Sequence, residues 1–341
     1  MDISRNIKQV ADGDDLSYDE MTTIMTEMMS GAISDVQIAA FLIALKMKEE
    51  TTDEISAAVT VMRKFATKVD VGLAPLIDTC GTGGDGSSSF NISTAAAFVT
   101  AACGGLVAKH GNRAASSASG SADVLEAAGA LIALSPEQVG KCIHANGIGF
   151  MFAPAHHGAT RHAGKVRKQI GARTLFNILG PMTNPASADR QVIGVFSPMW
   201  VPKIADVLKT LGTKHALIVC AADGMDEISI SAPTTVAEVK DGVVRHFQIK
   251  PDDFNIRQEE NNQALLAISP RESLSIINQI FLGEVGPAHN VVSLNAGAAL
   301  YVGGLVSDLG SGVQMASNAL IDGKAAKKFS EFIDYTNTFK Q

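Results

Sequence analysis

The segment from Gly81 to Thr94, with the sequence GTGGDGSSSFNIST, has the residue types of a phosphate-binding loop. Its glycines allow main-chain N–H groups to come close to phosphate oxygens. A helix follows, whose N-terminus carries partial positive charge, and Ser93 and Thr94 add hydroxyl donors there. A strand-to-helix turn with a polar tip has the same composition. The glycines alone therefore leave both interpretations open.

Two nucleotide-binding motifs partly match this loop but lack their other required residues. The pattern G-x-G-x-x-G spans Gly81–Gly86, and a dinucleotide site also needs an acidic residue about 20 positions later, at the end of the next strand. That strand ends in Lys109 and His110, and the first carboxylate after Asp85 is that of Asp123. The Gly-Lys-Ser/Thr of a Walker loop is also missing. The loop is better suited to a phosphorylated substrate, with Asp85 near sugar hydroxyls or a metal ion.

Acidic residues are missing from two long stretches of the chain, although its net charge is −7. One lies between Asp85 and Asp123 and the other between Glu137 and Asp189, and both contain lysines, arginines and histidines. An anionic substrate requires such a distribution. We interpret Lys165, Lys168 and Arg173 mainly as a solvated helix face.

A second polar segment, KHGNRAASSASGSADVLEAAG, spans Lys109–Gly129 and follows a predicted strand. It contains four serines: Ser116, Ser117, Ser119 and Ser121. Because α/β proteins bind ligands at the carboxyl ends of their strands, this loop is a second candidate anion site.

Two adjacent carboxylates follow another predicted strand, in the segment DGMDEIS. Asp226 and Glu227 offer the hard oxygen ligands that Mg²⁺ prefers, often together with substrate phosphates. Helix capping or solvated acids explain this motif equally well when it is considered alone.

The order of the predicted elements indicates two regions. Residues 1–70 contain only helical patterns, with capping boxes at Ser17–Glu20 and Ser34–Gln37 and a third helix start at Thr51 or Thr52. After residue 70, short apolar strands alternate with helices, which predicts an α/β domain with a mostly parallel sheet. A hairpin is expected about Asp241-Gly242, and helices after about residue 270.

Composition narrows the class of protein. The chain has 341 residues, of which 46% are hydrophobic, and its negative net charge argues against a general nucleic-acid or membrane surface. Its four cysteines lack C-x-x-C spacing, so they predict neither a zinc site nor a redox pair. No leader-like segment and no run of about 18 apolar residues is present. We expect a cytoplasmic protein.

Taken together, the motifs resemble the anthranilate phosphoribosyltransferase family over nearly the whole chain. The matching segments are GTGGDG…FNIST, KHGNR…SS.SGSADVLEA.G, GFMFAP…H…VRK..G.RT.FNILGP.TNP and DG.DEIS. Three residues depart from the family pattern: Gly158 and Thr160 in the HHGATRH segment, and Ala118 in the serine loop. The first two concern contacts on the side where the aromatic substrate arrives.

The resemblance implies a small N-terminal helical domain hinged to a larger α/β domain with a mostly parallel central sheet. The helical domain would comprise residues 1–70, completed by helices around 165–185, and the α/β domain residues 71–341. The implied reaction transfers the phosphoribosyl group from phosphoribosyl pyrophosphate to anthranilate in tryptophan biosynthesis. A homodimer formed through the helical domain is also implied.

The resemblance further implies the roles of individual residues. Those expected to bind phosphoribosyl pyrophosphate are Gly81, Gly84, Asp85, Ser89, Asn91, Ile92, Ser93, Thr94, Lys109, Asn112, Ser116, Ser117 and Ser121. Those expected at anthranilate are Gly81, His110, Asn112 and Arg167. Two Mg²⁺ ions are expected, with Ser93, Asp226 and Glu227 as ligands. No catalytic base is assigned, because the aniline nitrogen of anthranilate is neutral at pH 7, although His110 could accept a proton late.

Two alternatives remain at this point. A pyrimidine nucleoside phosphorylase would share the fold, but its glycine loop has a Lys-His-Ser-type lead-in where this chain has Asp78-Thr79-Cys80. A non-catalytic relative that binds nucleic acid would need a basic surface, which the net charge disfavours.

Overall fold

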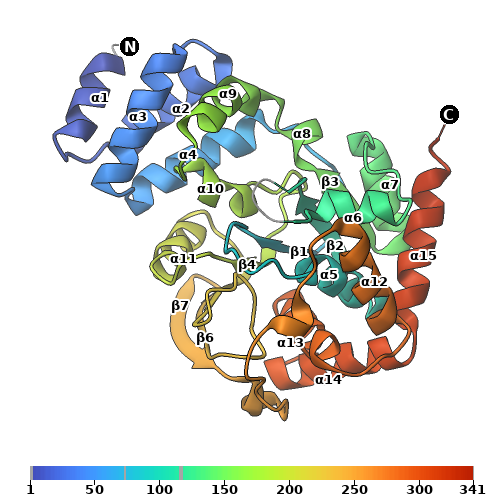
Figure 1. The fold of residues 1–341 in the computed structure, drawn as a ribbon. Coiled ribbons are helices and arrows are strands. Elements are labelled where there is room, and N and C mark those ends of the chain that lie inside the picture. The colour runs from blue at the N-terminus through green and yellow to red at the C-terminus, as the bar shows by residue number, and fades with distance from the viewer. Residues whose placement is uncertain (1–2, 73, 115–117, 341) are drawn as a thin grey trace.

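The computed structural model describes residues 3–72, 74–114 and 118–340. A group of helices at the N-terminus leads into a seven-stranded sheet, which is flanked by further helices (Figure 1). The strands are β1 (Leu76–Gly81), β2 (Leu106–Gly111), β3 (Ile148–Phe152), β4 (Arg190–Gly194), β5 (His215–Ala221), β6 (Thr234–Lys240) and β7 (Val243–Ile249).

The helices are α1 (Ile3–Ala11), α2 (Tyr18–Ser30), α3 (Asp35–Lys48), α4 (Thr52–Phe65), α5 (Ile92–Ala102), α6 (Ser121–Ala127), α7 (Pro136–Asn146), α8 (Ala153–His156), α9 (Arg161–Ile170), α10 (Phe176–Leu179), α11 (Trp200–Thr210), α12 (Pro270–Phe281), α13 (Pro287–Gly303), α14 (Leu309–Ile321) and α15 (Lys324–Asn337). Single turns of 3₁₀-helix occur at η1 (Gly158–Thr160), η2 (Gly180–Thr183), η3 (Pro251–Phe254) and η4 (Gln263–Leu265).

The sheet has the strand order β3-β2-β1-β4-β5-β6-β7. The first five strands in this order are parallel, whereas β6 and β7 form an antiparallel hairpin at one edge. Asp241 and Gly242, which join the hairpin, have φ values of 50° and 78°. Positive φ at both central residues is what a two-residue turn between twisted strands requires. The predicted fold class is therefore confirmed.

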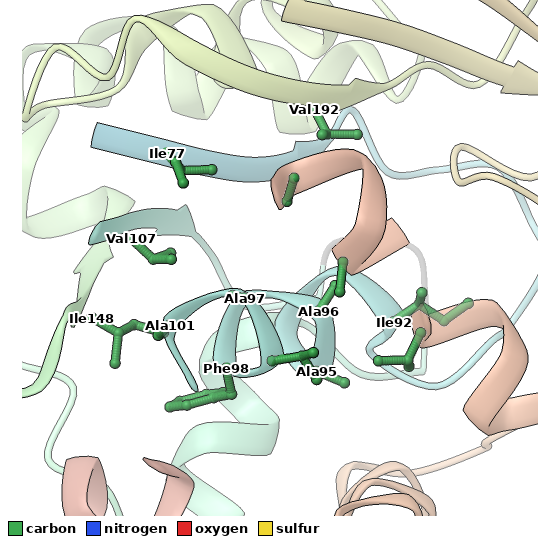
Figure 2. Packing of buried hydrophobic residues seen from close by; sticks show 14 of the residues in the cluster. Ile77, Ile92, Ala95, Ala96, Ala97, Phe98, Ala101, Val107, Ile148 and Val192 are labelled. Carbon is green, nitrogen blue, oxygen red and sulfur yellow. The ribbon is translucent and has the colours of Figure 1, made fainter. Parts of the chain in front are cut away.

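Side chains on the central strands alternate between two hydrophobic cores, because successive residues of a strand point to opposite faces. On β5, Leu217 and Val219 belong to one core, and Ile218 and Cys220 to the other. The first core lies between the sheet and α5, α13 and the other C-terminal helices. In Figure 2 the alanine-rich α5 lies against the sheet, close to Ile77 of β1 and Val107 of β2.

The second core joins the N-terminal helices to the opposite face of the sheet. It contains the buried methionines of α2 together with Ala163 and Val166 of α9 and apolar residues of α11. Helix α9 packs against α2 and α3, although it lies far from both in the sequence, and Figure 1 shows it among the N-terminal helices. Packing among α1–α4 alone therefore does not bury all of their apolar surface.

Within the described residues, no helix is both long enough and apolar enough to span a lipid bilayer.

Candidate functional site

The parallel strands bring three loops to the same edge of the sheet. The glycine loop follows β1, the serine loop follows β2, and the segment with Asp226 and Glu227 follows β5. Strand β1 pairs in parallel with β2 on one side and with β4 on the other, and β4 pairs in parallel with β5. Their carboxyl ends therefore point the same way, and the three loops lie together where α/β folds bind ligands.

The glycine loop needs its glycines for two separate reasons. Gly83, Gly84 and Gly86 have φ values of 66°, 73° and 77°, in the left-handed region that other residues rarely adopt. At Gly81, an added Cβ would lie 2.3 Å from the Asp226 Oδ2 atom. The loop can thus fold tightly over the acid pair only with glycine at these positions.

The start of α5 keeps hydrogen-bonding groups available. Asn91 occupies the N-cap position, but its side chain makes no capping hydrogen bond to the helix. Thr94 is 1% exposed, and its Oγ1 has no hydrogen-bond partner among the described residues. A buried hydroxyl without a partner is costly unless a ligand satisfies it. The first turn of α5 therefore has the features of an anion site.

The two carboxylates of Asp226 and Glu227 lie beneath the glycine loop and the α5 N-terminus. Asp226 Oδ2 accepts a hydrogen bond from Gly83 N at 2.7 Å, and Glu227 Oε1 accepts one from Ser93 N at 3.2 Å. Burial, reinforced by the neighbouring Asp85 carboxylate, raises the pKa of Asp226 to about 7. Burial and the charge of Asp226 also hold the pKa of Glu227 well above its usual range.

This acid pair fits a magnesium ion held jointly with a ligand. Its donors are hard carboxylate oxygens, and burial together with repulsion between neighbouring carboxylates raises their pKa values, so a bound cation would stabilise their charged forms. In the described ranges, no three His, Cys, Asp or Glu side chains form a group that could hold a metal without other ligands. Mg²⁺ commonly completes its coordination with water and substrate phosphates. A cation bound here would need such additional oxygen ligands.

Lys109 and Asp78 form a buried polar layer below the loops. The Lys109 Nζ atom, in a residue 2% exposed, donates to the Thr79 carbonyl at 2.6 Å. Asp78 accepts from Asn184 Nδ2 at 2.7 Å and from the main-chain N–H of His110 at 3.1 Å, and burial raises its pKa to about 6. The Lys109 ammonium therefore lies close to the end of β1, where the glycine loop begins.

The serine loop is tied to the glycine loop through Asn91. Ser119 Oγ donates to Asn91 Oδ1 at 2.8 Å, and Asn91 Nδ2 donates to the Ser119 carbonyl at 3.1 Å. Ser121 Oγ bonds instead to the main chain of Asn112, whose side chain is exposed. Two predicted serines, Ser116 and Ser117, lie outside the described residues.

The remaining predicted residues of the glycine loop differ in their contacts and in their burial. Ser89 pairs with Leu266 in an isolated antiparallel β-bridge. Asp85 Oδ1 accepts a hydrogen bond from Ser87 N at 3.2 Å. Ile92 is 1% exposed, so only its main chain can reach a ligand.

Three buried histidines lie near one another: His110 near the end of β2, His156 at the end of α8, and His157 directly after it. The rings of His110 and His157 are 5.0 Å apart, and the Nε2 atoms of both, and of His156, have no hydrogen-bond partner in the described part of the chain. Burial, with repulsion from neighbouring imidazoles, lowers the pKa of His110 to about 3 and that of His157 to about 4. These rings are neutral at pH 7, so His110 is a weak base and supplies no positive charge.

Arg167 provides a half-buried positive charge on α9. Its guanidinium lies over the Phe176 ring at 5.1 Å, and burial lowers its pKa without making it neutral. Nearby Lys165 is exposed and pairs with Asp35 at 3.3 Å, and Lys168 is exposed to solvent. Arg167 thus differs from the lysines on the same helix.

Arg173 is exposed to solvent, as expected, but it lies beyond the end of α9 and not on a helix face. Its guanidinium lies 4.1 Å from the Phe196 ring centroid, and Nη2 donates to the Gly84 carbonyl. This contact links the segment after α9 to the glycine loop. The sequence showed only an arginine among other bases, and no local pattern marked its distant partner.

Two of the three departures from the family pattern, Gly158 and Thr160, lie next to the histidines. Thr160 Oγ1 donates to the His157 carbonyl at 2.7 Å. A Cβ added at Gly158 would meet no atom within 4 Å, so this position has free space around it. Ala118 is exposed on the serine loop.

Family models match both regions of the chain. A model described as the helical bundle domain of a glycosyl transferase family matches residues 5–66, and the a/b domain of that family matches residues 73–326. Among curated proteins, an anthranilate phosphoribosyltransferase from Teredinibacter turnerae is 51% identical over 341 residues, covering 99% of this chain and 100% of the relative. The same enzyme from Thioalkalivibrio sulfidiphilus is 51% identical over 336 residues, covering 98% of this chain and 99% of the relative.

Solved structures agree with this result. An anthranilate phosphoribosyltransferase from Thermus thermophilus superposes with a TM-score of 0.92 at 39% identity, covering 99% of this chain and 100% of that one. The enzyme from Saccharomyces cerevisiae, in complex with PRPP and Mg, gives a TM-score of 0.90 at 25% identity, covering 99% of this chain and 98% of that one.

Proposed function

The chain belongs to the anthranilate phosphoribosyltransferase family, and on this basis we propose which of its residues carry the reaction. The protein transfers the 5-phosphoribosyl group from phosphoribosyl pyrophosphate to anthranilate, with release of pyrophosphate, in tryptophan biosynthesis. Curated members of this family are 51% identical in sequence to this chain over nearly its full length, which argues against the nucleoside phosphorylase and nucleic-acid-binding alternatives.

One observation carries the proposed site: the glycine loop, the uncapped start of α5 and the buried acid pair converge at the same edge of the sheet. Together they offer N–H donors for phosphate oxygens and carboxylates for a cation. The residues proposed to bind phosphoribosyl pyrophosphate are those of the glycine loop and the α5 N-terminus, with Lys109 and the serine loop: Gly81, Gly84, Asp85, Ser89, Asn91, Ile92, Ser93, Thr94, Lys109, Asn112, Ser116, Ser117 and Ser121.

Asp226 and Glu227 are the proposed magnesium ligands, and Ser93 the proposed contact to a second ion. The yeast relative bound to PRPP and Mg supports the metal, and the two buried carboxylates beside the glycine loop and the start of α5 support its place. Bound Mg²⁺ would neutralise negative charge on the pyrophosphate leaving group. The main-chain N–H groups of Gly83 and Ser93 donate to the acid pair and hold its carboxylates in place, whereas Thr94 Oγ1, which is buried without a partner among the described residues, is a proposed donor to the leaving group.

Arg167 is the proposed partner of the anthranilate carboxylate, since its planar guanidinium can form two parallel hydrogen bonds with a carboxylate. His110 is neutral at pH 7, and its Nε2 has no partner among the described residues, so it could hydrogen-bond anthranilate without adding charge. Asn112 and the main chain of Gly81 complete the proposed contacts. In the reaction the ribosyl C1–O bond breaks and a C1–N bond forms to the neutral aniline nitrogen, which then loses a proton. Orientation and charge stabilisation supply most of the rate enhancement.

The site is tested by removing the acid pair. The fluorescence of phosphoribosyl-anthranilate reports activity with and without Mg²⁺. We expect Asp226→Asn/Glu227→Gln to lower kcat/KM by about 100-fold or more, because a metal at a leaving group stabilises the transition state by several kcal/mol.

Glu259→Gln/Glu260→Gln is the matched control, since it removes two adjacent carboxylates from a segment distant in sequence from the three loops. Activity should remain close to that of the wild type in the control. Full Mg²⁺-dependent activity in the Asp226/Glu227 variant would remove the metal assignment.

We further propose a cytoplasmic homodimer. The division into a helical domain (residues 1–70, completed around 165–185) and an α/β domain (residues 71–341) remains our working proposal. Exposed apolar side chains on α3, including Val36 at 79% and Met47 at 81% exposure, support association through the helical domain.

A further inference from the structure

Ser273 of α12 contacts the start of α5 in an unusual way. It is fully buried, with 0% exposure, and lies about 180 residues from Asn91 in the sequence. Its Oγ donates to Asn91 Oδ1 at 2.7 Å and accepts from the main-chain N–H of Asn91 at 3.0 Å. One hydroxyl therefore fixes both the side chain and the main chain of Asn91.

A buried serine within a helix can satisfy its hydroxyl by donating to the carbonyl four residues earlier. Ser293 of α13 does this, with its Oγ 2.8 Å from the His289 carbonyl. Ser273 occupies the second turn of α12 and directs its hydroxyl to Asn91 instead. The difference shows that the Ser273 hydroxyl joins two elements rather than satisfying its own helix.

The contact with Ser273 determines which hydrogen bonds the Asn91 side chain can make. Asparagine is among the best N-cap residues, because its side-chain oxygen accepts from N–H groups of the first helical turn. In α5 it makes no such bond, and its Oδ1 accepts from Ser273 and Ser119 instead. As long as these bonds hold, the side chain of Asn91 does not compete for the N–H groups at the start of α5.

We propose that Ser273 is a positioning residue for phosphoribosyl pyrophosphate, and this inference rests on the proposed function. By holding the side chain of Asn91 away from the helix, Ser273 leaves the main-chain N–H and the Oγ1 of Thr94 to the phosphate oxygens. The N–H groups of Ile92 and Ser93 already donate to the Phe90 carbonyl and to Glu227. Ser273 also fixes the distance between the glycine loop and the serine loop, since Asn91 links to both Ser273 and Ser119. Helix α12 supports this arrangement by packing against α6, which follows the serine loop.

Steady-state kinetics of Ser273→Ala test the proposal. Removing two hydrogen bonds to Asn91 should raise the KM for phosphoribosyl pyrophosphate by about tenfold. The KM for anthranilate should change by less than about twofold, because the proposed Arg167 contact is unaffected. Ser293→Ala is the control, as it removes an equally buried helical hydroxyl that contacts no loop. Both KM values should stay close to wild type in this control.

A double-mutant cycle with Ser119→Ala gives a second test. If both hydroxyls act through Asn91, the combined loss in affinity should differ from the product of the single losses. An unchanged KM for phosphoribosyl pyrophosphate in Ser273→Ala overturns the proposal. Equal increases for both substrates, accompanied by a lower unfolding temperature than in Ser293→Ala, also overturn it and assign Ser273 a structural role.

The wild-type assay separates this inference from the proposed function. If the wild type forms no phosphoribosyl-anthranilate, the function itself fails. If the wild type is active and Ser273→Ala keeps its KM for phosphoribosyl pyrophosphate, only the positioning role fails.

Discussion

Arg167 is the residue whose role is easiest to separate from that of its neighbours. It is half-buried over Phe176 and forms no ion pair with the described residues, whereas Lys165 pairs with Asp35. Losing a desolvated charged pair costs about 2–5 kcal/mol. We therefore expect Arg167→Ala to lower kcat/KM for anthranilate by about 30-fold or more, with a much smaller change in KM for phosphoribosyl pyrophosphate.

Two further variants sharpen this prediction. Arg167→Lys should restore only part of the activity, because an ammonium cannot reproduce two parallel hydrogen bonds. Lys168→Ala, at the exposed neighbouring position, should leave both KM values near wild type. Steady-state kinetics with each substrate varied in turn would reject the assignment if Arg167→Ala and Lys168→Ala behaved alike.

His157 gives the protein a pH-dependent contribution to stability. Burial first, and then the neighbouring His156, lower its folded-state pKa to about 4, against about 6.5 in an unfolded chain. Below pH 6.5 the unfolded chain binds a proton that the folded chain excludes, so this contribution to stability is present at pH 7 and is lost as the pH falls. Between pH 7 and pH 5 the loss should be about 2 kcal/mol.

Urea unfolding of His157→Gln at pH 7 and pH 5 measures this contribution. We expect the free energy of unfolding of the variant to fall by about 2 kcal/mol less than that of the wild type over this range. His246→Gln, on the exposed edge strand β7, controls for the loss of an imidazole at the surface. Parallel pH dependences for the wild type and His157→Gln would show that burial does not keep this imidazole neutral.

Helices and strands were largely predictable because their signals are local. The capping boxes at Ser17, Ser34 and Thr51 each satisfy the N-terminus of a helix with neighbouring side chains, and the structure contains all three. Apolar runs bounded by turn residues predicted the strands for the same reason. The positions of the loops then follow from parallel pairing, which places the glycine loop and Asp226 at the same edge of the sheet.

Contacts made by distant elements could not be predicted in this way. Ser273 belongs to a helix that was predicted only as part of a C-terminal helical region. No feature of the sequence distinguished Arg173 from the solvated lysines Lys165 and Lys168. Their partners, Asn91 and Gly84, are about 180 and 90 residues away in sequence. The neutral state of the histidines likewise depends on burial by several elements, which spacing alone does not reveal.

The two hydrophobic cores determine how the N-terminal helices relate to the rest of the protein. The second core continues from α2 through α9 and α11 to one face of the sheet, so the helical region shares its core with the α/β region. Arg173 adds a polar link from the segment after α9 to the glycine loop. Substitutions in α9 and the segment after it can therefore affect both the stability of the helical region and the position of the glycine loop.

The outer face of α3 is apolar although it is exposed in the single chain. Val36, Ala40, Ile43 and Met47 recur at intervals of four, three and four residues, which places them along one side of a helix. Ile38, Phe41 and Leu45 fill the opposite, buried side. An apolar stripe of this length favours burial against another surface, and a second copy of the chain is the partner that we propose.

Light scattering coupled to size exclusion tests the proposed dimer. We expect the wild type to have twice the chain mass of 35.6 kDa. Val36→Glu/Met47→Glu should shift the protein to a monomer, because a symmetric interface would bury each new charge twice and the chain already has a net charge of −7. Leu282→Glu, at a site with 82% exposure outside the helical region, should remain dimeric. A wild-type monomer would exclude the dimer itself. A dimeric α3 variant together with a monomeric Leu282→Glu would exclude α3 as the interface, because the charge introduced on α3 would then meet only solvent.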